Sequence, residues 1–325
     1  MLMKIRVLLL AIVSCVVVLT GWAETPEKGR SVCHSGQAGP YGTVALLKKK
    51  QGVDKADFST YWRDIHGMLA TRIPGFWTYR QFHLGEELPL LRRLPENYSA
   101  ALESLDGFAD VSFCSSEAIA GLVSSPISEL IKQDERNVFD SSYLYGVIPG
   151  DSLTLRREAP FESAVGGELD EVVLVLLARG SQESRAGFRA AVDESMALIL
   201  EQCADLQRLR VNYLQPYDES GWPAPDVNHR PAQQMDAAVE MQFRDRETVL
   251  HCLNSGASVG ELAGDGTQGR LQLVYGVTAR YAMVVDGKAT ALALRGLPAM
   301  TLIQRLGADS QLDEAVLQAL YGEGR

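Results

Sequence analysis

Apolar and polar positions follow short, distinct periods in the first half of the chain. Residues 43–48 (TVALLK) read as a strand, and residues 54–71 read as a helix. Residues of one apolar stripe recur along that helix at helical spacing, namely Phe58, Trp62, Ile65 and Leu69. Pro74-Gly75 ends the helix, and residues 76–84 read as a second strand.

A polar loop separates these elements from a second set. We expect a third strand at residues 108–114, a helix at 116–132 and a final strand at 141–148. The order is strand, helix, strand, strand, helix, strand. This order predicts a ferredoxin-like unit whose two helices cover one face of a sheet.

The same pattern returns 130 residues later. Residues 43–50 (TVALLKKK) align without a gap with residues 173–180 (VLVLLARG). The identities at this offset are Phe58/Phe188, Arg80/Arg210, Leu84/Leu214, Pro95/Pro225, Asp106/Asp236, Phe113/Phe243, Glu117/Glu247 and Tyr145-Gly146-Val147/Tyr275-Gly276-Val277. We interpret the chain as two copies of one module, the second with helices near 184–203 and 246–255.

A sheet with helices on one side only leaves an apolar face in water, which is unfavourable. Two such sheets can cover each other. The predicted fold class is therefore α+β, with two tandem ferredoxin-like (βαββαβ) modules forming an intramolecular dimeric α+β barrel. Any cavity is expected between the two sheets.

These patterns divide the chain into segments. We expect a signal peptide at 1–23, a flexible lead-in at 24–42, module 1 at 43–150, a linker at 151–169, a degenerate module 2 at 170–280, and a C-terminal hairpin and helices at 281–325. The hairpin turns at Asp286-Gly287. The helices are expected near 299–306 and 311–321, the latter with Ser310 and Asp313 as a capping box.

The first 23 residues have the layout of a secretory signal. Lys4 and Arg6 precede an apolar run at 7–20, and Gly21-Trp22-Ala23 supplies small residues for cleavage after Ala23. The run is shorter than the roughly 20 residues that span a membrane, so we expect no membrane span after cleavage and a periplasmic or secreted protein. The alternative is a lipoprotein box ending at Cys15.

Charge and cysteines narrow the classes of partner. The full chain carries a formal charge of −10, and removing Lys4 and Arg6 leaves −12. No basic stripe compensates, which argues against nucleic acid as a partner. The mature cysteines are Cys33, Cys114, Cys203 and Cys252. They allow two disulfides in three pairings, and their spacing is not that of a metal site.

Aromatic and imidazole side chains gather in residues 58–84, FSTYWRDIHGMLATRIPGFWTYRQFHL. This segment holds two of the four Trp and two of the five His. Strand alternation places Trp77, Tyr79, Gln81 and His83 on one face. We expect that face toward the barrel interior, with Phe76, Phe82 and Leu84 toward the helices. An aromatic and polar face suits a flat organic ligand, although a polar core without a ligand would look the same.

The second copy lacks these groups. At the same offset Trp62, His66, Trp77 and His83 are replaced by Val192, Met196, Gln207 and Tyr213. We therefore take the first copy as the working half. His66 and His83 are the predicted catalytic residues, since an imidazole exchanges protons near neutral pH. Trp62, Trp77, Tyr79 and Gln81 are the predicted substrate-binding residues.

The first copy also carries a family resemblance. KKKQGVDKADFSTYWRDIHGMLATRIPGFWTYRQFHL, followed by DGFADVSFCSSEAIAGLVSSP and DERNVFD, resembles the EthD family and its F-x-x-Y-W-x-x-x-H helix. The resemblance covers roughly residues 43–148, and more faintly 173–278. It implies a dimeric α+β barrel. Members are implicated in ether-degradation operons, and fungal relatives resemble dehydratases or decarboxylases of polyketide anthrones. The sequence departs from the family at Gly67-Met68, where a Pro is usual.

Three hypotheses follow for the function. The first is an exported EthD-like protein that binds a hydrophobic aromatic or polyketide-like small molecule and carries out dehydration, decarboxylation or isomerisation without a cofactor. The second is a non-catalytic carrier of such a molecule. The third is a haem-binding barrel with a His ligand. The sequence leaves further association into a homo-oligomer open.

Overall fold

The computed structural model describes residues 33–88, 93–95, 104–157, 171–254, 262 and 269–322. The expected signal peptide, Cys15, most of the lead-in before Cys33 and most of the linker lie outside these residues. No helix within the described ranges is long and apolar enough to cross a membrane.

Residues 41–147 follow the predicted order of elements. The elements are β1 (Tyr41–Lys49), α1 (Lys55–Tyr61), the π-helix η1 (Trp62–His66), α2 (Gly67–Ala70), β2 (Phe76–Glu87), β3 (Gly107–Phe113), α3 (Ser116–Ser124), α4 (Pro126–Val138) and β4 (Phe139–Val147). The helix expected at 116–132 is two helices, because Ser125 is extended and caps α4, whose first residue is Pro126.

The rest of the chain has two strands, a helix, two strands, a helix and a long strand, followed by a short strand and further helices. The elements are β5 (Ser152–Arg157), β6 (Val172–Ala178), α5 (Arg185–Gln202), β7 (Leu206–Tyr213), η3 (Glu219–Gly221), β8 (Ala237–Phe243), α6 (Arg246–Asn254), β9 (Leu271–Val285), β10 (Lys288–Ala289), α7 (Ala291–Arg295), α8 (Leu297–Leu306), η5 (Asp309–Leu312) and α9 (Glu314–Tyr321). Strand β5 and helix α7 were not predicted. The expected capping box is wrong, since the Asp313 side chain makes no capping hydrogen bond.

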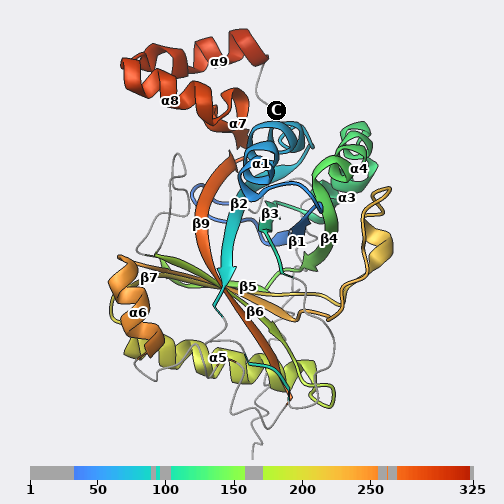
Figure 1. The fold of residues 1–325 in the computed structure, drawn as a ribbon, viewed down its shortest axis with the longest axis vertical. Coiled ribbons are helices and arrows are strands. Elements are labelled where there is room, and N and C mark those ends of the chain that lie inside the picture. Colours follow the sequence, from blue (N-terminus) through green and yellow to red (C-terminus); the bar gives the residue numbers. More distant parts are fainter. Residues whose placement is uncertain are drawn as a thin grey trace, which may run out of the picture. The chain divides into compact units, whose positions relative to one another are not determined.

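The strands form one antiparallel sheet in the order β4-β1-β3-β2-β9-β6-β8-β7-β5, with β10 paired to β9. Strand β9 pairs with β6 through residues 271–276 and with β2 through residues 275–284. It therefore joins the first half of the chain, residues 41–147, to the second half, residues 152–285. Figure 1 shows the sheet curling, with α1, α3 and α4 beside the first strands and α5 and α6 beside the later ones. The predicted α+β class is confirmed, and the strands expected in two facing sheets form one curled antiparallel sheet.

Each face of the sheet is buried in a different way. One apolar cluster packs α1–α4 on strands β1–β4, and a second packs α5 and α6 on the later strands. A third cluster joins the remaining faces of both halves, with Val44, Phe82, Leu174 and Tyr275 among its members. The face of each half that its helices leave uncovered is therefore buried by the other half.

Strand β2 turns its side chains opposite to our expectation. Phe82 and Leu84 belong to the cluster between the halves, whereas Tyr79 packs with the helices. Gln81 also faces the helices, since its Nε2 donates to the Trp62 carbonyl at 3.0 Å. The prediction that the Tyr79, Gln81 and His83 face looks into the barrel interior is wrong, because periodicity of two separates the faces without saying which is which.

Buried charges lie between the halves beside this third cluster. Arg80 Nη2 is 2.6 Å from Asp110 Oδ2 and 3.0 Å from Glu240 Oε2, and Arg210 also pairs with Asp110. Burial opposes ionisation of Asp110, but Arg210 and Arg80 overcome it and lower the pKa of that carboxyl. Removing one partner of such a network leaves an uncompensated buried charge, which costs about 3–5 kcal/mol.

Two disulfides connect elements that are distant in sequence. Cys33 bonds to Cys114, just after β3, and Cys203 after α5 bonds to Cys252 in α6. The Cα–Cα distances are 5.2 and 5.5 Å, which are ordinary for disulfides. These pairs select one of the three arrangements that the sequence left open.

We expect the Cys203–Cys252 bond to be a main source of stability in the second half. It closes a segment with a sequence separation of 49, and a closure of this length restricts the unfolded chain. Replacing both cysteines by Ser should lower the free energy of unfolding by about 2–4 kcal/mol in urea titrations. Reduction of the double variant should then affect only Cys33–Cys114. A non-reducing peptide map with any other pairing would contradict the structure.

Candidate functional site

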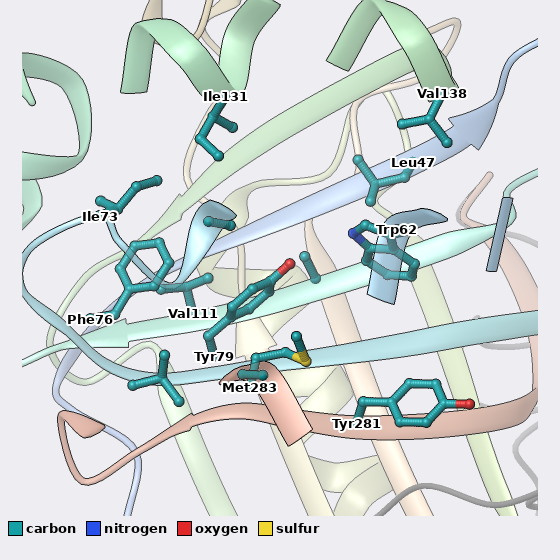
Figure 2. Close-up of a cluster of buried hydrophobic side chains, with 14 of the residues drawn as sticks. Leu47, Trp62, Ile73, Phe76, Tyr79, Val111, Ile131, Val138, Tyr281 and Met283 are labelled. Atoms are coloured by element: carbon teal, nitrogen blue, oxygen red, sulfur yellow. The ribbon is translucent and has the colours of Figure 1, made fainter. Parts of the chain in front are cut away.

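A cavity of about 70 Å³ lies between the helices of residues 55–138 and the sheet beneath them. Its wall is mostly apolar and aromatic, and its polar members include His66, Tyr79 and Glu135. Figure 2 shows the surrounding cluster, with Trp62 and Tyr79 lying between the strands and the residues that descend from α4. The volume holds a few water molecules or one compact ligand.

A π-helical turn places two of the predicted residues on this cavity. Trp62 and His66 begin and end η1, where the Gly67 N–H donates to the Trp62 carbonyl. Gln81 Nε2 donates to the same carbonyl. A Cβ on Gly67 would lie 2.6 Å from Gln81 Nε2 and 2.8 Å from that carbonyl oxygen, so glycine is required here. Single π-helical turns are frequent at functional sites.

His66 is buried and held by a carboxylate. Its Nδ1 lies 2.9 Å from Asp134 Oδ2, and its ring packs edge-on against Phe139. Burial opposes ionisation of Asp134, but hydrogen bonds from His66 and Tyr61 overcome it and lower its pKa. An ionised Asp134 accepts a hydrogen bond from the Nδ1–H group, which leaves Nε2 as the ring atom available to a ligand.

Tyr79 and Gln81 form a buried polar pair at the floor of the site. Gln81 Nε2 donates to the Tyr79 hydroxyl at 2.8 Å. Burial raises the pKa of Tyr79 well above its usual range, so the phenol stays protonated. Tyr79 lines the cavity, whereas Gln81 supports it from behind through Trp62 and Tyr79.

His83 is buried but is not among the residues that line the cavity. Its Nδ1 lies 2.7 Å from Ser59 Oγ, and its ring packs against Trp62 and Tyr281 at centroid distances of 4.5 and 4.9 Å. Burial, with a smaller contribution from the charges of Arg63 and Lys55, lowers the pKa of His83 to about 3. The ring is therefore neutral at physiological pH.

Trp77 lies apart from the other predicted residues. The pairing of β2 with β3 shifts register between Phe76 and Thr78, so strict alternation fails at this residue. Phe76 turns into the cavity, and the Trp77 indole Nε1 donates to the Gln37 carbonyl at 2.8 Å. Trp77 also lies close to the Gly287 turn.

Three residues of the site were missed from the sequence. Asp134 and Glu135 belong to α4, which extends to Val138 and so past the expected end at Lys132. Glu135 shares the apolar stripe of Ile131 and Val138, and a carboxyl in such a stripe is a signal that could have found it. Trp222 comes from the loop between β7 and β8, and no local pattern connects it to this cavity.

No group of three or more His, Cys, Asp or Glu side chains within the described ranges is placed to hold a metal ion. Cys33, Cys114, Cys203 and Cys252 form the two disulfides.

Comparison with solved structures finds similar chain traces at low sequence identity. An anthrone oxidase-like protein has a TM-score of 0.45 and 10% identity, covering 77% of this chain and 95% of its own. A dye-decolorizing peroxidase from Bacteroides thetaiotaomicron has a TM-score of 0.37 and 9% identity, covering 75% and 94%. Scores this low support no conclusion about ligand or reaction.

No curated protein sequence matches the chain. Residues 50–142 match the model of the EthD domain, and this segment runs from the end of β1 into β4 and includes His66 and Asp134. The resemblance to the EthD family that was read from the sequence is thus confirmed for residues 50–142.

Proposed function

We propose that this protein binds a flat hydrophobic, aromatic or polyketide-like small molecule in the His66 cavity and transfers protons to and from it without a cofactor. The observation that carries the proposal is the pairing of His66 with Asp134 at 2.9 Å on the wall of an otherwise apolar and aromatic cavity. Dehydration, decarboxylation and isomerisation all require such a transfer.

The orientation of His66 suits a general base. Asp134 engages Nδ1, so the lone pair of the neutral ring is on Nε2. Asp134 would also stabilise the imidazolium formed once Nε2 takes a proton. A positioned base of this kind contributes about 10²–10⁴-fold to a rate. Surrounding apolar side chains exclude water, which strengthens the interaction of the charged pair.

The two predicted histidines differ in setting. His66 lines the cavity, whereas His83 contacts the indole of Trp62. The predicted catalytic role of His83 stays a prediction. Its contacts favour a positioning role, because His83 and Gln81 together fix the indole and the backbone of the η1 turn.

We further infer that the chain is a tandem of two ferredoxin-like modules closed into one barrel. Equivalent contacts recur at the 130-residue offset. Lys49 N–H donates to Asp106 Oδ2 at 3.0 Å, and Arg179 N–H donates to Asp236 Oδ2 at the same distance. Thr43 pairs with Val111 between β1 and β3. The residues 130 positions later, Val173 and Met241, pair in the same way between β6 and β8. The strands lie in the order β4-β1-β3-β2 in the first half and β9-β6-β8-β7 in the second. Counted along the chain, both orders are fourth, first, third, second.

Export through cleavage after Ala23 is part of the same proposal. The two disulfides support it, because such bonds persist in oxidising compartments. A haem-binding barrel is the less favoured alternative.

Replacing His66 by Asn tests the proposed base. The Asn amide can still donate to Asp134 but cannot accept a proton from carbon. We expect exchange of the C-1 hydrogens of 2-tetralone in D₂O, followed by NMR, to fall by about 10²–10⁴-fold. Binding of 2-tetralone, followed by tryptophan fluorescence, should change little.

The matched control is His251→Asn, which removes an exposed imidazole from α6 and should leave the exchange rate unchanged. Equal exchange in wild type and His66→Asn would exclude His66 as the base. Binding of 2-tetralone without any exchange above the buffer rate would identify a carrier.

Replacing His83 by Asn tests its buried, neutral state. The pKa of His83 is about 3 in the fold against 6.5 as the ordinary value. Its contribution to stability is therefore complete above pH 6.5 and is lost as the pH falls toward 3. Between pH 7.5 and 5.0, wild type should lose about 2 kcal/mol more unfolding free energy than the variant in urea titrations. Parallel losses would show that His83 becomes protonated in the folded state.

A further inference from the structure

Glu135 is a buried carboxyl on the same cavity as His66. Its residue is 5% exposed. Oε1 accepts a hydrogen bond from the Trp222 indole Nε1 at 2.6 Å. Oε2 has no partner that meets hydrogen-bond geometry among the described residues, although the nearby Ser142 hydroxyl lowers the pKa of Glu135. A buried polar atom left in this state costs about 1–3 kcal/mol, which is a reason to look for a ligand that would satisfy it.

Few charges face this carboxyl. His66 approaches from η1 and His229 from the loop before β8, and the phenols of Tyr79 and Tyr217 also lie within electrostatic range. Lys132 lies over the Trp222 ring and is paired with Glu129. Burial raises the pKa of Glu135, and His66, Trp222, His229 and Ser142 only partly oppose it.

We propose that Glu135 is a neutral carboxylic acid that donates a hydrogen bond from Oε2 to an uncharged acceptor oxygen, a ketone or phenol oxygen, on an apolar ligand. The inference deepens the proposed function and rests on it. The indole N–H already occupies Oε1 as a donor, so the proton of a neutral acid belongs on Oε2. An ionised Glu135 would instead select a cation.

The two groups of the cavity then act as acid and base on one molecule. Nε2 of His66 takes a proton from the carbon next to a carbonyl, and the electrons of that C–H bond form the carbon–carbon double bond. The carbonyl electrons move to oxygen, which takes the proton of Glu135 Oε2. The product is an enol, and the reverse transfers restore both side chains. Carboxyl groups kept neutral by apolar surroundings are suited to this role.

Trp222 makes this site depend on both halves of the chain. It reaches the cavity from the loop between β7 and β8, and that loop is fixed to β4 by the Ser142 N–H, which donates to the Asn228 carbonyl at 3.1 Å. His229 Nδ1 also lies 2.8 Å from the Ser142 carbonyl. The loop therefore covers Glu135 and removes it from water.

Three ligands with one carbon skeleton test the assignment: tetralin, 2-tetralone and 2-aminotetralin, which differ only in a hydrogen, a ketone or an ammonium group. Calorimetry on the wild-type protein should show 2-tetralone binding about tenfold more tightly than tetralin, the value of one hydrogen bond. 2-Aminotetralin should bind most weakly, because the cavity would offer it no carboxylate.

Variants at position 135 identify the donor. Glu135→Leu should bind 2-tetralone and tetralin equally. Glu135→Gln should keep the preference, since its amide can donate from the place of Oε2, while losing the enolisation measured by deuterium exchange. Glu194→Gln removes an exposed carboxyl from α5 and should match wild type. Infrared spectra provide a readout without ligand, in which the carbonyl stretch of a protonated acid should vanish in Glu135→Gln.

The outcomes separate the two proposals. Binding with tightest affinity for 2-aminotetralin, or equal affinity for all three, overturns the role of Glu135 while leaving a ligand cavity. If Glu135→Leu still binds 2-tetralone more tightly than tetralin, the role of Glu135 as the donor is also overturned. Failure of all three molecules to bind overturns the proposed function, and the ligand assigned to Glu135 with it.

Discussion

Strand β2 is buried on both faces, and this constraint organises the rest of the molecule. Arg80 and Phe82 face the other half of the chain, with the guanidinium lying over the phenyl ring. Tyr79, Gln81 and His83 face the helices. One strand therefore supplies the contacts between the halves and the floor of the cavity. A change in its register would exchange the two sets and lose both.

Buried charged side chains lie where the two halves meet, and burying them costs desolvation free energy. Arg80 contacts one carboxylate from its own half and one from the other, Asp110 and Glu240. Arg210 reaches back from the second half to Asp110. These bonds are directional, so they fix how the halves meet more tightly than apolar packing would. Buried charges of this kind add specificity more readily than net stability.

Sequence periodicity was sufficient for the order of strands and helices in residues 41–147, except that it merged α3 with α4, and it missed β5 and α7. It identified Trp62 and His66 because helical spacing and a distinctive segment coincide there. It failed for Trp77, since a register shift in a strand leaves no periodic trace. It also assigned the wrong face of β2 to the helices. Which face of β2 meets the helices depends on the side of the sheet that the helices cover. The sequence does not decide this, because both faces of β2 carry aromatic residues.

Long-range parts of the site had no local signal. Trp222 reaches Glu135 across 87 residues, and its loop has no repeating pattern. The π-helical turn was equally hidden. Its wider turn brings His66 rather than the predicted Ile65 to the buried face, so Ile65 is 52% exposed and the expected α-helical stripe is wrong at that position. The disulfide pairs likewise depended on the fold, which brings α5 and α6 together.

The residues 130 positions after Trp62 and His66 lie in a different setting. Trp62 and His66 line a cavity, whereas Val192 and Met196 are both fully buried in an apolar cluster. Filling space in this way is the more stable solution, since empty apolar volume and an unsatisfied carboxyl both cost free energy. Around His66 the cavity and the π-helical turn occur together with a Glu135 oxygen that has no hydrogen-bond partner within the described part of the chain. Costs that accumulate at one place in a fold are the physical mark of a site kept for binding or chemistry.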